Sequence, residues 1–362
     1  MIEDPRHQSV SALLRVLALL AACASAAQSV GALLVAPQQK PPATSKFARF
    51  AAPETVPAVT DPKFVTREQA EAFLQPDEPV LGLALGSEAR AYSLWQLERR
   101  LVVNDRIAGR AVAITWCPFS HTAVVYARSA GDRELILESD GRLLHDALVL
   151  RDRETGALWT QADGACIEGG AAAVAGTLAA LPALQTTWKV WKQEQPATLV
   201  LDKGATAITS SGYTDYYADP RRVGLGSAEL KEPRMGGKAL VVGIVAGSDR
   251  VAIPLDRLKR DLIVSTVADR QALAALYDPA TGTMRVVRRE ARGHIVTLRR
   301  GFGDIFGKPT PPYLVDEETA SRWDFAGRAT SGRMQGHRLP LFPHRLQFWY
   351  AWQAYFPKSR VE

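Results

Sequence analysis

The sequence lacks the short motifs that mark the commonest catalytic sites. It contains no glycine-rich phosphate loop, no G-x-S-x-G nucleophile elbow and no H-E-x-x-H metal-binding pair. These absences exclude the familiar phosphate-loop, serine-hydrolase and zinc-peptidase sites. Histidine is also scarce, with six residues in the chain, and we assign no metal or catalytic role to His294, His337 or His344.

Charge of one sign is not concentrated either. The chain carries a net charge of +6 without a basic run, which favours a solvated basic surface over a nucleic-acid site. Its 22 prolines and 27 glycines are spread along the sequence, as in proteins with many short elements rather than in helical bundles. A length of 362 residues indicates two domains or one duplicated domain.

The N-terminal segment, residues 1–28, resembles an export signal. Arg6 and Arg15 precede the apolar run Val16–Ala22, which is too short to cross a bilayer as a mature helix. Residues 29–63 are rich in Ala, Pro, Gln, Ser and Thr, a composition that cannot bury a core and is typical of a tether. We expect the folded part to start near Phe64.

The end of the export segment has three interpretations. Ala24-Ser25-Ala26 is an A-x-A cleavage signal, and Leu20-Ala21-Ala22-Cys23 resembles a bacterial lipobox, in which Cys23 would be lipidated. The third interpretation is an uncleaved anchor. We therefore expect an extracytoplasmic protein, either periplasmic or a membrane-anchored lipoprotein. The membrane is then the partner of the N-terminus, and no nucleic acid is expected as a partner.

Two parts of the chain resemble one another at a constant sequence offset, which we call the repeat offset. The matching pairs are Gly82 with Gly243, Gly86 with Gly247, Leu94 with Leu255, Trp188 with Trp349, Trp191 with Trp352 and Pro196 with Pro357; Trp159 matches Trp323 at a slightly larger offset. We interpret the chain as a first repeat (residues 64–205), a connector (206–227) and a second, degenerate repeat (228–362). Each repeat begins with a strand, a Gly-Ser turn, a strand and a short helix, which predicts a strand-rich α+β fold of two pseudo-symmetric tandem copies with short helices packed on the sheets.

The chemistry-bearing residues gather in Trp116-Cys117-Pro118-Phe119-Ser120-His121. This stretch follows the apolar run Ala111–Thr115, which predicts a buried strand. Pro118 ends the strand because proline has no N–H to donate. The motif therefore presents a thiol at a strand end, with a hydroxyl and an imidazole nearby in sequence.

Comparison at the repeat offset shows which residues of this motif occur in both copies and which occur only in the first. Pro118 corresponds to Pro279, so the strand-then-proline turn recurs. Cys117, Ser120 and His121, in contrast, correspond to Asp278, Thr281 and Gly282. Both copies need the turn, whereas only the first has the thiol and the imidazole. We therefore place any chemistry in the first copy.

Several further segments accompany the motif. They are Ile114-Thr115-Trp116-Cys117-Pro118, Thr122–Tyr126, Gly141, Leu150–Gln161, Thr186-Thr187-Trp188 and, near the C-terminus, Trp323–Ala329. In this combination the chain resembles the bacterial and archaeal domain-of-unknown-function 3179 (DUF3179) family over roughly residues 65–360. The resemblance implies no established activity. Family members usually carry C-P-x-C, and some are described as selenoproteins, which implies redox chemistry at that motif.

The chain departs from that family pattern at Ser120, where the second cysteine would stand. A C-x-x-S motif cannot close a local disulfide, so a dithiol cycle within it is excluded. A monothiol mechanism remains, as does one in which Cys166 resolves an oxidised Cys117. A structural disulfide between Cys117 and Cys166 is a further alternative in an oxidising compartment.

Our main hypothesis is an exported protein with a thiol-redox site, a monothiol oxidoreductase. In it Cys117 is the attacking thiolate, His121 lowers its pKa, Ser120 donates a hydrogen bond to it, and the redox partner is unidentified. The alternative is a noncatalytic metal- or small-ligand-binding protein. In that protein Cys117 is a small buried residue and His121 a loop histidine, and the cleft lies between the two copies.

A metal site would begin from Cys117 and His121, since thiolate and imidazole suit copper or zinc. His145, Asp146 or Cys166 would complete the ligand set. Asp146 has two further interpretations, orienting an imidazole or holding a turn, and His145 is otherwise a surface histidine. No cofactor is identified from the sequence.

Overall fold

The computed structural model describes residues 47–52, 55–169, 176–204, 208–225, 235–301, 304–305, 308–309 and 311–362. The predicted export segment, with Cys23, and most of the predicted tether lie outside these residues. In the described part no helix is long and apolar enough to cross a membrane. All described residues belong to one unit, Lys40–Glu362.

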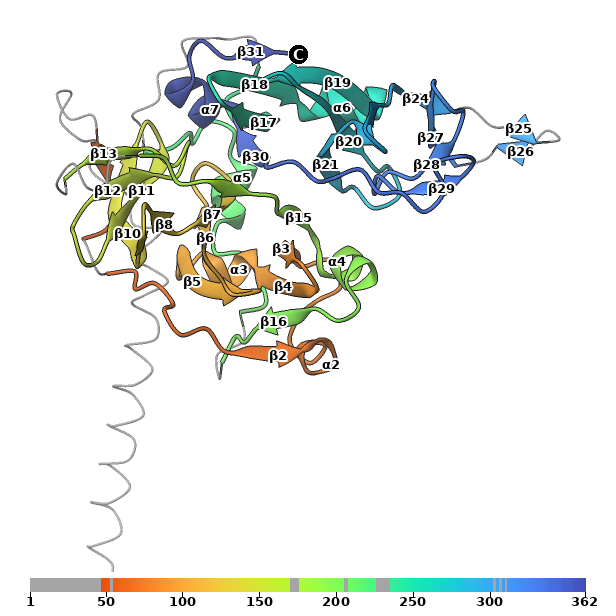
Figure 1. The fold of residues 1–362 in the computed structure, drawn as a ribbon. Coiled ribbons are helices and arrows are strands. Elements are labelled where there is room, and N and C mark those ends of the chain that lie inside the picture. The colour runs from red at the N-terminus through yellow and green to blue at the C-terminus, as the bar shows by residue number, and fades with distance from the viewer. Residues whose placement is uncertain are drawn as a thin grey trace, which may run out of the picture. The chain divides into compact units, whose positions relative to one another are not determined.

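Strands dominate this unit, and the predicted strand-rich α+β class is confirmed (Figure 1). The described part has six helices, each of four to seven residues: α2 (Arg67–Ala70), α3 (Leu94–Leu97), α4 (Trp188–Glu194), α5 (Thr214–Ala218), α6 (Leu255–Asp261) and α7 (Trp349–Tyr355). Helices this short are marginal alone, so they depend on burying apolar side chains against the sheets. The start of α3 follows from its sequence, because the Ser93 hydroxyl accepts a hydrogen bond from the Gln96 N–H at 3.3 Å.

The first half contains three sheets and one short hairpin. Their strand orders are β15 (Leu184–Thr187), β3 (Pro79–Leu85), β4 (Glu88–Ser93), β16 (Leu199–Leu201), β2 (Phe64–Thr66); then β14 (Ala180–Leu181), β7 (Thr122–Ala127), β6 (Arg110–Cys117), β5 (Val102–Ile107); then β1 (Phe47–Arg49), β10 (Leu137–Leu144), β11 (Ala147–Asp152), β12 (Leu158–Thr160), β13 (Cys166–Glu168); and β8 (Ser129–Ala130) with β9 (Arg133–Glu134).

The second half contains three sheets and two short hairpins. Their strand orders are β30 (Arg345–Phe348), β17 (Leu240–Ala246), β18 (Asp249–Pro254), β31 (Arg360–Val361); then β19 (Ile263–Ala268), β20 (Gln271–Tyr277), β21 (Met284–Arg288); then β24 (Leu298–Gly301), β27 (Tyr313–Asp316), β28 (Arg322–Trp323), β29 (Ala329–Ser331); and the pairs β22 (Glu290–Ala291) with β23 (His294–Ile295) and β25 (Asp304–Ile305) with β26 (Lys308–Pro309).

Strand registers recur between the halves at the offset seen in the sequence. Val80 faces Ser93 across β3 and β4, and Val241 faces Pro254 across β17 and β18. The rarer parallel pairing recurs as well, since β16 joins β4 and β31 joins β18, and the paired residues correspond at the repeat offset in both strands. These matched registers support the proposed duplication.

A contact between a glycine and a tryptophan recurs in both halves. A Cβ on Gly82 would lie 2.2 Å from the Trp191 ring, and a Cβ on Gly243 would lie 2.2 Å from the Trp352 ring. The two indole N–H groups also bond equivalent hydroxyls, Thr198 at 2.9 Å and Ser359 at 2.8 Å. Glycine is therefore required in β3 and in β17, because the indole of the later helix takes the space of its side chain.

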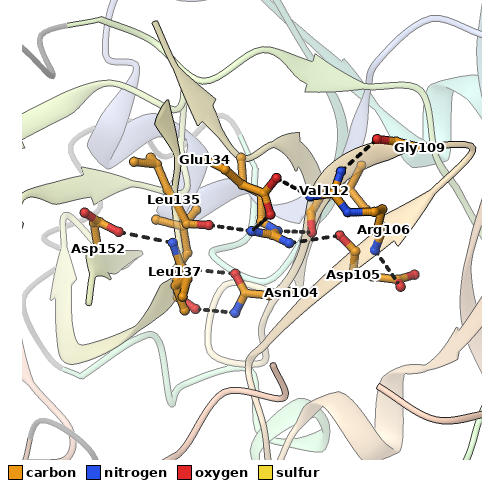
Figure 2. A network of polar contacts seen from close by, with 11 residues as sticks. Asn104, Asp105, Arg106, Gly109, Val112, Glu134, Leu135, Leu137 and Asp152 are labelled. Carbon is orange, nitrogen blue, oxygen red and sulfur yellow. Dashed lines mark hydrogen bonds and ion pairs between the residues drawn. The ribbon is translucent and has the colours of Figure 1, made fainter. Parts of the chain in front are cut away.

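Polar side chains bond backbone groups of neighbouring segments in the first half (Figure 2). The Asn104 amide exchanges hydrogen bonds with both backbone groups of Leu137, at 2.8 and 2.9 Å. Nearby, the buried Arg128 guanidinium donates to the carbonyls of Val112 and Leu135 at 3.2 and 2.7 Å. This network ties β5 and β6 to the segment that leads into β10.

The arginine of this network recurs in the second half. Arg289 corresponds to Arg128 at the repeat offset, and its guanidinium donates to the equivalent carbonyls, those of Leu273 and Val296, at 3.2 and 3.0 Å. The two halves therefore share this arginine–carbonyl contact, buried at Arg128 and partly buried at Arg289, as well as their strand registers.

The folded part starts earlier than Phe64, which corrects the predicted tether of residues 29–63. Residues 47–49 form β1 and pair with β10. Phe50 is buried, and its ring lies 5.6 Å from that of Phe119. The Pro- and Ala-rich composition hid this strand because two aromatic anchors and backbone pairing are sufficient to dock a short segment.

We expect Gly82→Ala and Gly243→Ala each to lower the free energy of unfolding by about 1–3 kcal/mol, because the added methyl group overlaps an indole ring in a packed core. Urea unfolding of the two variants measures this loss. Gly236→Ala is the matched control, since nothing lies within 4 Å of its added Cβ. Equal stability of all three variants would contradict the proposed Gly–Trp contact.

Candidate functional site

Cys117 is the last residue of β6, as the sequence predicted, and its side chain is buried (1% exposed). It faces Thr122 of β7 across the strand pair. Residues 118–121 form the turn between these strands, closed by the His121 N–H and the Pro118 carbonyl at 3.4 Å. We refer to residues 116–121 as the thiol turn.

His121 occupies a backbone position that favours glycine. Its φ is +57°, in the left-handed region, and the corresponding Gly282 of the second half has φ +70°. A side chain in this region is strained, at a cost on the order of 1 kcal/mol. The histidine is therefore held there by the contacts of its ring. These are edge or tilted contacts with Trp116, Phe348 and Tyr217, at 5.2, 5.3 and 5.5 Å between centroids.

Burial raises the pKa of the Cys117 thiol to about 11. The Ser120 hydroxyl and the backbone N–H groups of Ser120 and Phe119 act in the opposite direction, and the Asp146 carboxylate raises the pKa further. The thiol donates a weak hydrogen bond to the Asp146 carbonyl at 4.0 Å. Desolvation is the largest of these effects, so the sulfur is held as a neutral thiol.

The expected lowering of the thiol pKa by His121 is not supported. Burial lowers the pKa of His121 to about 4, with the Leu346 carbonyl acting in the opposite direction. The imidazole is thus neutral near pH 7 and supplies no positive charge to a thiolate. The sequence pattern suggested an ion pair because it placed the two groups four residues apart, but burial favours the neutral form of both.

Tyrosine hydroxyls hold the thiol turn from outside its own sheet. Tyr216 of α5 and Tyr350 of α7 both donate to the Phe119 carbonyl, at 2.9 and 2.6 Å, and their oxygens are 2.9 Å apart. The Phe348 N–H donates to the Ser120 carbonyl at 2.9 Å. Three segments far apart in sequence, β6–β7, α5 and β30–α7, therefore meet at this turn.

Residues 211–225 of the connector, which had no role in the sequence-based hypotheses, form a cap on the thiol turn. Tyr213 and Tyr216 contact the Phe119 ring at 5.4 and 6.0 Å, and Tyr217 contacts His121. Burial raises the pKa of all three tyrosines, and the Cys117 sulfur contributes to each increase. Two adjacent tyrosines at 216 and 217 were the only signal in the sequence for this cap.

Glu98 anchors the start of the cap. Its carboxylate is 4% exposed and accepts hydrogen bonds from the Ser211 hydroxyl at 2.6 Å and the Gly212 N–H at 2.8 Å. Burial raises its pKa to about 7, although both hydrogen bonds act in the opposite direction. A carboxyl that titrates near neutrality thus fastens the connector to the C-terminal end of α3.

Asp146 anchors the other end of the cap. His145 and Asp146 both have positive φ, +49° and +62°, and form the two-residue turn between β10 and β11. The Asp146 carboxylate accepts a hydrogen bond from the Leu225 N–H at 3.3 Å, and a Cβ on Gly224 would lie 2.3 Å from it. Asp146 therefore holds a turn, one of its two expected roles, while His145 is exposed and lies 6.2 Å from the Tyr355 ring.

The ligand sets expected for a metal or a disulfide are not assembled. Cys117 and Cys166 are both free thiols, and Cys166 lies in β13 of a different sheet. Among the described residues, no group of three or more His, Cys, Asp or Glu side chains is placed to hold a metal ion. The structure therefore corrects the alternative of a Cys117–Cys166 disulfide and leaves the Cys117–His121 pair without a third ligand of these types.

A cleft lies apart from the thiol turn, with a volume of about 220 Å³. Its lining comes equally from both halves: Gly82, Ala84, Pro182, Leu184, Trp191, Glu194 and Gln195 from the first, and Arg285, Val287, Ala326, Arg338, Leu339, Pro340 and Leu341 from the second. Clefts with apolar walls and a few converging charges are the usual form of small-ligand sites. The sequence predicted a cleft between the copies but none of its charged residues.

Comparison with known proteins adds a family and little else. The family model described as "Protein of unknown function (DUF3179)" matches residues 53–359. No curated protein and no solved structure matches the chain. The family resemblance seen in the sequence is thereby confirmed, without an activity attached to it.

We expect Glu98→Gln to change how stability depends on pH. Because the folded pKa of Glu98 is about 7 and the unfolded value is near 4.5, its ionisation destabilises the fold progressively between pH 4.5 and 7. The variant should therefore gain roughly 2–3 kcal/mol over the native chain between pH 5 and pH 8. Urea unfolding at both pH values measures this gain, with the exposed Glu290→Gln as control. If Glu98→Gln changes the free energy of unfolding by the same amount at both pH values, the prediction is wrong.

Proposed function

The chain belongs to the DUF3179 family, and we propose that it is an extracytoplasmic, noncatalytic protein that binds a small ligand. The observation that carries this proposal is the state of Cys117. Its thiol is buried and neutral where β6–β7, α5 and β30–α7 meet. Thiolate nucleophiles need exposure and a lowered pKa. With a pKa of about 11, only about one Cys117 thiol in ten thousand is ionised at pH 7.

The cleft between the halves supports binding as the alternative to thiol chemistry. It combines the apolar surfaces of Trp191, Leu339 and Leu341 with the charged groups of Glu194 and Arg285. The thiol turn then serves the cleft indirectly, because it joins the two halves whose residues line it. Export, through cleavage or lipidation at the N-terminus, is part of the proposal and is supported by the sequence of residues 1–28.

Thiol redox chemistry remains a second candidate because of one specific arrangement. The Ser120 hydroxyl and the N–H groups of Phe119 and Ser120 all lower the pKa of the Cys117 thiol. These groups would stabilise a thiolate if the cap of residues 211–225 moved away and water entered. Under this second function the cap regulates access to Cys117.

Alkylation separates the two functions. We expect iodoacetamide at pH 7 to modify Cys117 roughly a hundredfold more slowly than the partly exposed Cys166, because Cys117 is buried and protonated. Peptide mass spectrometry of samples taken over time gives both rates from one reaction. Unfolding in urea is the control, since both thiols should then react alike. Comparable rates in the native chain would overturn the noncatalytic proposal.

Gly224→Ala tests whether the cap controls access. The added methyl group would lie 2.3 Å from the Asp146 carboxylate, at a residue whose φ is +52°, so the end of the cap must shift. We expect alkylation of Cys117 to become roughly tenfold faster, with the Cys166 rate unchanged. Gly236→Ala, which adds a methyl group in open space, is the matched control. An unchanged Cys117 rate would show that the cap does not shield the thiol.

A further inference from the structure

We propose that the cleft between the halves binds a small monocarboxylate with an apolar body, and that Arg338 pairs with its carboxylate. The inference rests on the proposed binding function and names its ligand class. Nothing in the family description assigns a ligand to this cleft. Its charge balance, its geometry and its walls each point to the same chemistry.

The charged residues of the cleft carry one more positive than negative charge. Arg285 forms a two-point ion pair with Glu194, with nitrogen–oxygen distances of 2.8 and 3.2 Å. Arg338 adds a third contact to the same carboxylate at 3.3 Å. Two guanidinium groups thus share one carboxylate, and the nearby Arg328 is paired with Asp324 at 3.5 Å. A monoanion would balance the remaining charge.

The two arginines differ in how much of their side chain is available. Arg285 is 3% exposed and is held in place by Glu194, whereas Arg338 is 46% exposed. Of the five N–H donors of Arg338, one meets Glu194 within the described part of the chain, so its planar fork keeps donors for a second acceptor. Carboxylates match this fork with two parallel hydrogen bonds.

The walls and the size of the cleft define the rest of the ligand. Apolar surface comes from Pro182, Trp191, Leu339, Pro340 and Leu341. The volume of about 220 Å³ lies below the range of drug-sized sites and equals that of roughly seven water molecules. An aromatic or short branched aliphatic acid fits these limits.

The corresponding place in the second half has different residues. At the repeat offset, Gln195 and Glu194 correspond to Phe356 and Tyr355. Phe356 packs against the Trp352 ring at 4.7 Å, and the Tyr355 hydroxyl lies 3.3 Å from the Asp163 carboxylate. In the second half, the aromatic side chains of Tyr355 and Phe356 pack at this place. In the first half, Glu194 instead forms an ion pair at the cleft.

Isothermal titration of the full chain with benzoate tests the proposal, with benzyl alcohol and benzylamine as neutral and cationic probes of similar shape. We expect benzoate to bind with a Kd of about 1 mM or tighter, as small ligands in formed sites do. Each of the other probes should bind at least roughly tenfold more weakly, because the remaining charge of the cleft is positive. Equal affinity for the three probes would overturn the assignment.

Two variants assign the site. Arg338→Gln should weaken benzoate binding roughly tenfold or more. Ala84→Trp should abolish it, because a large ring on this exposed lining residue fills the cleft without removing a charge. Arg257→Gln is the matched control, since Arg257 is a partly exposed arginine of α6 that pairs with Asp261. Urea unfolding shows that each variant is folded.

The outcomes separate this inference from the function on which it rests. Absence of benzoate binding, or unchanged binding to Arg338→Gln, overturns the ligand class while Cys117 stays unreactive. Rapid alkylation of native Cys117 overturns the noncatalytic function whatever benzoate does. Benzoate affinity that is lost in Arg338→Gln and Ala84→Trp but kept in Arg257→Gln supports the site.

Discussion

The structure depends on satisfying the buried carbonyl groups of the turn that follows β6. Strand pairing ends at Cys117, so the Phe119 and Ser120 carbonyls have no ladder partner. A buried carbonyl without a partner costs several kcal/mol. Tyr216 and Tyr350 satisfy the first, and the Phe348 N–H satisfies the second. These donors come from the connector, from β30 and from α7, so the turn and the segments around it stabilise one another.

Burial also decides the protonation of Cys117, Glu98 and His121 around this turn. It raises the pKa of Cys117 to about 11 and of Glu98 to about 7, and it lowers that of His121 to about 4. Each shift favours the neutral form, because a charge here would lose its hydration without gaining an opposite partner. In the cleft, by contrast, buried groups keep their charges because they are paired. There Arg285 and Arg338 lower the pKa of Glu194 in spite of its burial, and the charges persist.

Much of the fold could be predicted from the internal resemblance of the sequence. The repeat offset predicted which strands and helices correspond, and the registers of β3–β4 and β17–β18 agree with it. The strand that ends at Cys117 was predicted from its apolar run and from Pro118. The start of the folded part was not, because β1 is very short and depends on pairing with β10, which lies far away in the sequence.

The sequence by itself determined the family, the strand-rich α+β class and the position of the thiol at a strand end, because these follow from local pattern and from repetition. Only the tertiary structure decided the protonation state and the reactivity of that thiol and its neighbours. Proximity in sequence suggested a reactive Cys117–His121 pair, whereas burial makes both neutral. The cleft of Glu194, Arg285 and Arg338 could not be foreseen, since these residues lie 91 or more positions apart from the first to the second half. The physical reason is that charge and reactivity depend on solvent and on distant partners, and folding alone determines both.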